Sequence, residues 1–76
     1  MNTNKNQSEI LRVIGDNIRK HRNKKGWSQE DLAFECGLHR TYIGSVERGE
    51  KNITILNLII IKNKLGVHLE HLYPEK

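Results

Sequence analysis

The sequence predicts an all-α fold, a compact five-helix bundle in one small domain. Apolar residues recur at the three- and four-residue spacing of amphipathic helices, and no stretch alternates as a strand would. Capping residues and glycines separate these periodic stretches. The chain has 76 residues, which is room for a single domain with a thin core.

The first helix is expected to begin at Ser8, a capping residue, after a flexible polar tail of residues 1–7. Cations gather towards the end of this helix, where the helix dipole favours them, and Gly26 ends it. Residues 8–76 then form the folded domain. The apolar residues at helical spacing are Ile10, Leu11, Ile14 and Ile18.

A second helix is expected directly after Ser28. Asp31 follows three residues later, which is a capping-box arrangement with Asp in place of the usual Glu. Trp27 before the cap and Leu32 inside the helix fit a hydrophobic staple, which would fix the angle between the first two helices.

The stretch from Gln29 to Arg48, QEDLAFECGLHRTYIGSVER, organises the rest of the chain. Small or apolar residues stand at plus 4, 8, 14 and 17 from Gln29, and this spacing matches a helix-turn-helix. The helix His39–Arg48 is the expected recognition helix, which lies in the major groove of DNA. The alternative is an ordinary helical hairpin. The four positions are Ala33, Gly37, Ile43 and Val46.

Two further helices complete the expected bundle. Thr54 caps a fourth helix over residues 55–65, and Gly66 ends it. A short fifth helix follows over residues 68–73, and Pro74 stops it. The side chains expected to face the core from the fourth helix are Ile55, Leu58, Ile61 and Leu65.

These last helices hold more apolar surface than one core face can hide. A monomer rarely exposes such a patch without a use, so we expect a homodimer through it. Leu72 and Tyr73 are the residues expected to be most exposed to the partner. The alternative is that Ile59 and Ile60 cover the base of the first helix in a monomer. The expected interface residues are Leu56, Ile59, Ile60, Leu69, Leu72 and Tyr73.

The composition favours a nucleic-acid partner in a cytoplasmic protein. The net charge of +4 points to an anionic partner, and nucleic acid is the commonest. The single cysteine, Cys36, excludes an internal disulfide and is expected to be a small buried apolar residue. No secretory signal is visible, and the longest apolar run, residues 58–61, is too short to span a membrane.

The same residues argue against an enzyme and against a metal site. His68 and His71 are three residues apart, but no carboxylate or cysteine lies at a spacing that completes a ligand set. The sequence has no nucleophile–base arrangement and no phosphate-cradling glycine loop. We therefore expect no cofactor and no small-molecule substrate.

Taken together, the elements resemble the phage-repressor and Cro-type DNA-binding family, whose fold is lambda-repressor-like. The matching residues include Ile18-Arg19, Ser28-Gln29-Glu30, Leu32-Ala33 and Leu65-Gly66-Val67. His21 stands where the family often has an apolar residue, and Lys62 where it often has alanine. Both can lay their stems along the edge of the core.

A narrower match resembles the controller proteins of bacterial restriction-modification systems. That resemblance implies a small homodimeric regulator that binds operators upstream of its own gene and the endonuclease gene. Within the regulator class, the alternative is a phage-type repressor that never activates. A different alternative is an antitoxin-like module whose main partner is another protein. The matching strings are Arg40-Thr41-Tyr42-Ile43, Glu47-Arg48-Gly49 and Asn52-Ile53-Thr54.

Arg40 has the best chemistry for recognising a base, because its planar fork can make two bonds to guanine O6 and N7. Thr41 can meet a thymine methyl or a phosphate, and Tyr42 can pack on sugar or reach a phosphate. Ser28 and Gln29 sit at a helix N-terminus, which favours phosphate. The remaining candidates are His39, which can touch phosphate, and Arg48, Lys51 and Asn52, which can bind the DNA backbone or reach an adjacent groove.

Four charged positions need a separate interpretation. Arg22 could be a phosphate clamp, but the resemblance implies a structural ion pair with Glu47 that links the first and third helices. Glu30 and Glu35 have no evident structural duty. Acidic residues here would lie beside DNA, where they gain nothing from phosphate. We expect them to contact a basic region of RNA polymerase, as resembling activators do. The alternative is that they only keep the helix soluble.

Overall fold

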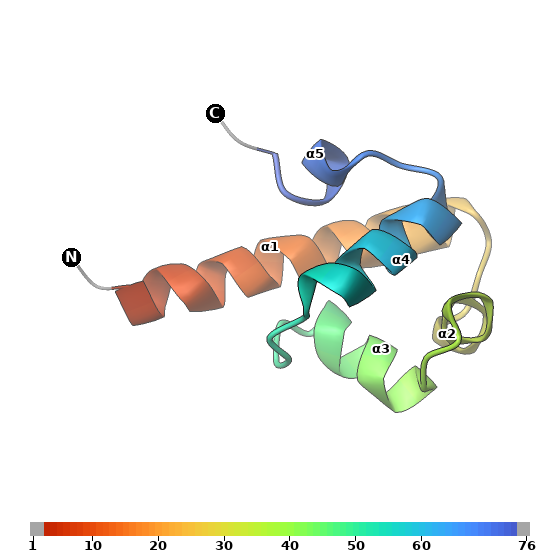
Figure 1. The fold of residues 1–76 in the computed structure, drawn as a ribbon, viewed down its shortest axis with the longest axis horizontal. Coiled ribbons are helices and arrows are strands. Elements are labelled where there is room, and N and C mark those ends of the chain that lie inside the picture. The colour runs from red at the N-terminus through yellow and green to blue at the C-terminus, as the bar shows by residue number, and fades with distance from the viewer. Residues whose placement is uncertain (1–2, 75–76) are drawn as a thin grey trace.

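A computed structural model describes residues 3–74 and confirms the five-helix architecture (Figure 1). The described residues contain no strand. The long first helix runs the length of the molecule, α4 crosses in front of it, α5 lies above, and α2 and α3 lie below (Figure 1). The helices are α1 (Thr3–Lys24), α2 (Gln29–Cys36), α3 (Arg40–Glu47), α4 (Ile55–Leu65) and α5 (Leu69–Leu72).

The expected start of the first helix is wrong. The helix begins at Thr3, so Ser8 lies inside it and does not cap it. Residues 3–7 contain neither glycine nor proline, and nothing stops the helix from continuing outwards once its later turns are packed. Part of the expected tail is therefore helical, while Met1 and Asn2 lie outside the described residues, as do residues 75–76 at the other end.

The other helix ends follow the expected capping chemistry. The Oγ of Ser28 accepts from the backbone N–H of Asp31 at 3.0 Å, and the Asp31 carboxylate accepts from the N–H of Ser28 at 2.9 Å. Thr54 Oγ1 accepts from the N–H of Asn57 at 3.1 Å. Gly37 ends α2 with φ of 68°, a left-handed conformation that favours glycine and turns the chain towards α3.

The core lies between α1, α2, α3 and α4, and α5 closes it. Leu72 is 0% exposed, so the expectation that it faces a partner is wrong. The α5 helix returns over α1, where Asn17 Nδ2 donates to the Leu72 carbonyl at 3.0 Å. The buried apolar side chains are Ile14, Ile18, Leu32, Ala33, Ile43, Val46, Ile61, Leu65 and Leu72.

Ile55 was expected in the core but is 65% exposed. It is the first residue of α4, and helical side chains tilt towards the helix N-terminus. Its side chain therefore points beyond the packed part of the helix. Leu58, by contrast, is half-buried against the core, and Ile61 and Leu65 are buried within it.

The polar departures from the family pattern lie at the edge of the core, as expected. His21 and Lys62 are both half-buried. The His21 ring lies 6.1 Å from the His71 ring, measured between centroids. Burial, together with the nearby Lys24, lowers the pKa of His21. Cys36 is half-buried rather than fully buried, and its burial raises the pKa of the thiol.

Candidate nucleic-acid interface

The two helices of the motif meet at an open groove that collects most of the expected DNA contacts. Arg40 and Thr41, in the first turn of α3, lie beside Ser28 and Gln29 at the start of α2. The groove has a volume of about 450 Å³. Its lining consists of Arg22, Ser28, Gln29, Glu30, Arg40, Thr41, Gly44 and Arg48.

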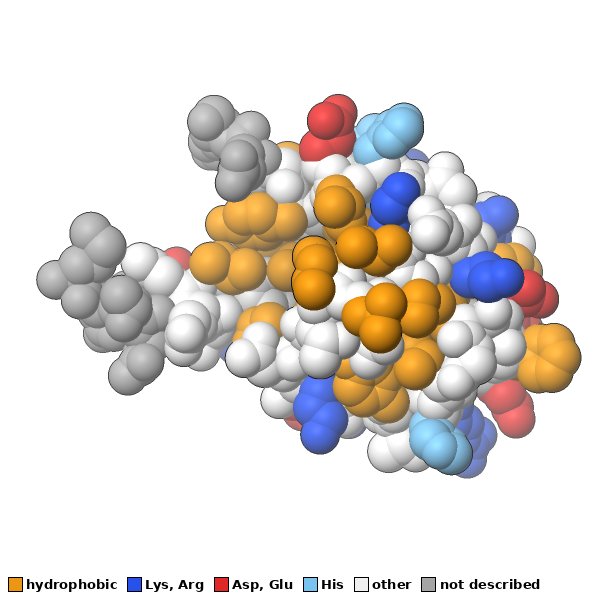
Figure 2. Space-filling model, in the orientation of Figure 1, with side chains coloured by type: hydrophobic (Ala, Val, Ile, Leu, Met, Phe, Trp, Pro, Cys, Tyr) orange, Lys and Arg blue, Asp and Glu red, His pale blue; other side chains and the backbone are white. Residues whose placement is uncertain are grey.

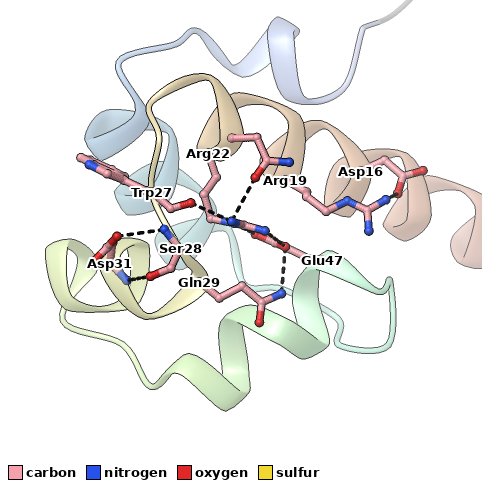
Figure 3. Close-up of polar contacts among 9 residues, drawn as sticks. Asp16, Arg19, Arg22, Trp27, Ser28, Gln29, Asp31 and Glu47 are labelled. Carbon is pink, nitrogen blue, oxygen red and sulfur yellow. Dashed lines mark hydrogen bonds and ion pairs between the residues drawn. The ribbon is translucent and has the colours of Figure 1, made fainter.

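A buried ion pair lies next to this groove, and Figure 3 shows it beside Gln29. Arg22 on α1 donates to Glu47 on α3 through Nε to Oε2 at 2.6 Å and through Nη2 to Oε1 at 2.9 Å. Arg22 also donates to the carbonyl of Trp27 at 2.8 Å. The hydrogen bond to Glu47 raises the pKa of Arg22. Arg22 therefore joins α1, α3 and the loop before α2, and its fork is committed to the protein rather than to phosphate.

The same carboxylate holds a residue of the groove in place. Gln29 Nε2 donates to Glu47 Oε1 at 3.0 Å (Figure 3). The amide oxygen of Gln29 then lies towards Gly44, because a Cβ built on Gly44 would be 3.3 Å from it. One amide hydrogen of Gln29 is held by Glu47, and its other polar groups are available to DNA.

Arg48 lies between Glu50 and Gly44. Its Nε lies 3.1 Å from the Glu50 carboxylate, and both side chains are more than half exposed. Its Nη1 lies 3.2 Å from a Cβ built on Gly44. Arg48 thus folds back along α3 into the groove. A phosphate would compete with Glu50 for it.

The remaining DNA candidates lie outside the groove. His39, Lys51 and Asn52 are exposed on the loops that flank α3. Tyr42 is half-buried against the core, and its hydroxyl accepts a hydrogen bond from Asn57 Nδ2 at 3.0 Å. The structure therefore divides the expected contacts into a groove set and a flanking set.

The acidic residues of α2 have different environments. Asp31 is engaged in the capping box with Ser28. Glu30 and Glu35 are exposed, and among the described residues neither forms an ion pair. Phe34, which the sequence interpretation did not single out, is 83% exposed on the same helix. The sequence could have indicated this exposure. At 100° per residue around the helix axis, Phe34 points away from the side that Leu32 and Ala33 bury.

Apolar side chains gather on one face of the molecule, over α4 and towards α1 and α5 (Figure 2). Three of the expected interface residues are exposed: Leu56 by 65%, Ile59 by 37% and Leu69 by 40%. Ile60 and Tyr73 are half-buried. Ile10, Val13 and Ile55 are exposed apolar residues that the predicted interface did not include.

Within residues 3–74, no group of three or more histidine, cysteine, aspartate or glutamate side chains could hold a metal ion. His68 and His71 are joined by a hydrogen bond in which His71 Nδ1 accepts from the His68 N–H at 3.0 Å. No described helix is long and apolar enough to cross a membrane.

Comparisons with known proteins agree with this geometry. The Helix-turn-helix family model matches residues 18–72. Control protein C.SmaI of Serratia marcescens is 47% identical over 64 residues, which cover 84% of this chain and 76% of that protein.

Solved structures of controller proteins are also similar. The restriction-modification controller protein C.AhdI of Aeromonas hydrophila has a TM-score of 0.79 at 40% identity, covering 83% of this chain and 96% of that one. The controller protein C.Esp1396I, solved as a tetramer in complex with its natural 35-base-pair operator, has a TM-score of 0.76 at 39% identity, covering 84% of each chain. The chain therefore belongs to the helix-turn-helix family and, within it, to the controller proteins of restriction-modification systems.

Proposed function

We propose that this protein regulates the transcription of a restriction-modification system, including its own gene, by binding operator DNA as a homodimer in the cytoplasm. The observation that carries the proposal is the groove in which the first turn of α3 lies beside the N-terminus of α2. Helix-turn-helix proteins place this turn against base edges in the major groove. The proposal includes no catalytic step, cofactor or small-molecule substrate.

Each group in the groove has a defined task in this proposal. Arg40 is exposed and recognises guanine through two hydrogen bonds. Thr41 next to it contacts a base methyl or a phosphate. The N-terminus of α2 attracts a phosphate, to which Ser28 can donate its hydroxyl proton, because its Oγ acts as an acceptor in the cap. His39, Lys51 and Asn52 contact the DNA backbone on either side.

A footprint on the DNA upstream of this protein's own gene tests the function directly. Paired protected half-sites about one helical turn apart, at roughly 34 Å, are expected for a two-fold dimer. Stimulation or repression of that promoter in a purified transcription assay then distinguishes a controller from a repressor that never activates. If a large excess of folded protein protects no part of this DNA, the antitoxin-like alternative is favoured.

Arg40→Ala should remove specific binding, at a cost of about 1–3 kcal/mol, and relax the base preference at one operator position. Lys51→Ala is the matched control, because it should weaken all sequences about equally and reduce the salt slope by about one unit. Fluorescence anisotropy with operator and scrambled duplexes measures both effects. Unchanged operator affinity for Arg40→Ala would show that the base-reading assignment is wrong.

We also propose that the outward face of α2 contacts RNA polymerase bound at the neighbouring promoter. Glu30 and Glu35 gain nothing from phosphate, and the exposed Phe34 between them in sequence adds an apolar anchor. Such a face suits a partner surface that is basic and has an apolar pocket.

A further inference from the structure

Asn57 on α4 links the dimerisation candidates to the recognition helix. Its Nδ2 donates to the hydroxyl oxygen of Tyr42 on α3 at 3.0 Å, and both side chains are half-buried. Leu56 precedes Asn57 on the same helix and is 65% exposed. The bond thus joins a side chain of α3 to the helix that carries the proposed interface.

The direction of this bond decides what Tyr42 can offer to DNA. A phenol oxygen has one proton to donate and lone pairs that accept. Because the Tyr42 oxygen accepts from Asn57, its own proton stays available for another acceptor. Within the described chain no acceptor takes that proton. The acceptors on DNA are phosphate oxygens and the base atoms O6, N7 and O4.

We propose that Asn57 is a positioning residue that holds the Tyr42 hydroxyl as a hydrogen-bond donor towards operator DNA. The ring of Tyr42 packs against the core, and Asn57 fixes the oxygen at its end. A donor that is already oriented loses little conformational freedom on binding. This inference rests on the proposed function, since it assigns a task to a residue of the same DNA interface.

The side chain of Asn57 can be tested separately from the fold of its helix. The cap at the start of α4 uses the backbone N–H of Asn57, which donates to Thr54 Oγ1. Removing the side-chain amide leaves that cap intact. Asn63 offers a matched control, because it is an exposed amide on the same helix.

A double-mutant cycle in operator binding tests the proposal. Asn57→Leu and Tyr42→Phe should each weaken operator binding by roughly 3–10-fold, and the double variant should be no weaker than Tyr42→Phe alone. Asn63→Leu should bind as the wild type does. A thermal melt of each variant checks the fold, and Asn57→Ala replaces Asn57→Leu if leucine disturbs the helix.

Two results would overturn the inference. One is wild-type affinity for the Asn57 variants. The other is a double variant whose loss is the product of the two single losses, because Asn57 would then act independently of Tyr42. If the wild-type protein bound operator DNA no more tightly than scrambled DNA, the proposed function would be overturned, and this inference with it.

Discussion

At the scale of single residues, Glu47 joins the packing of the helices to the proposed DNA interface. Its buried carboxylate accepts two hydrogen bonds from Arg22 and one from Gln29. The first two bonds fix the distance between α1 and α3, and the third orients a groove residue. One side chain therefore couples the stability of the bundle to the geometry of its binding surface.

Removing one partner of this pair should be costly. Arg22→Met leaves Glu47 charged and buried, so it should lower the free energy of unfolding by about 3–5 kcal/mol. The double variant Arg22→Met with Glu47→Leu should be less destabilised than Arg22→Met alone, because no uncompensated charge remains. Urea denaturation measures both.

Arg19→Met is the control for that comparison, because Arg19 pairs with Asp16 at 3.3 Å on the surface, where both side chains are more than half exposed. It should change stability by no more than about 1 kcal/mol. If Arg22→Met changed the free energy of unfolding as little as Arg19→Met, the Arg22–Glu47 pair would have no structural importance.

At the scale of elements, the chemistry of the helix ends was predictable, but the extent of α1 was not. The caps at Ser28 and Thr54 and the left-handed turn at Gly37 depend on local chemistry that a sequence displays. The start of α1 depends on whether an uncapped turn continues a packed helix, and no residue near Ser8 marks that boundary.

Gly15 shows a second limit of sequence reasoning. A Cβ built on it would lie 2.4 Å from the Val46 carbonyl oxygen, so only glycine lets α1 approach the end of α3 this closely. From the sequence alone, a glycine inside a helix indicates only a weak position. Its packing role depends on an element more than 25 residues away, which local patterns do not specify.

The outward face of α2 gives a prediction at the same scale. Glu35→Gln and Phe34→Ser should keep operator affinity and reduce promoter stimulation in a purified transcription assay, because both side chains are exposed on α2 and neither lines the groove. Ser45→Ala on α3 serves as a control with full stimulation. Full stimulation by both α2 variants would contradict the polymerase contact.

At the scale of the whole molecule, apolar surface is divided between a small core and an exposed face. The sequence showed that the last two helices carry more apolar residues than one core face needs, and the exposed Leu56, Ile59 and Leu69 agree with that count. It could not show which leucine of α5 fills the core, because Leu69 and Leu72 share a face of so short a helix. Only the return of α5 over α1 places Leu72 inside.

The apolar face predicts a homodimer, and substitutions can now be chosen that spare the core. Leu56→Glu should raise the dimer dissociation constant by about 100-fold or more, because a two-fold interface loses two buried leucines, each worth about 1.5–3 kcal/mol. Operator binding should weaken with it, since one recognition helix contacts only one half-site. Phe34→Glu changes an apolar side chain of α2 that is 83% exposed, and it should leave the sedimentation mass unchanged. Leu72→Glu should unfold the chain rather than dissociate it, because its side chain is fully buried. Sedimentation at micromolar concentration separates these outcomes, and a wild-type monomer that still binds paired half-sites would place the contact between copies somewhere other than this face.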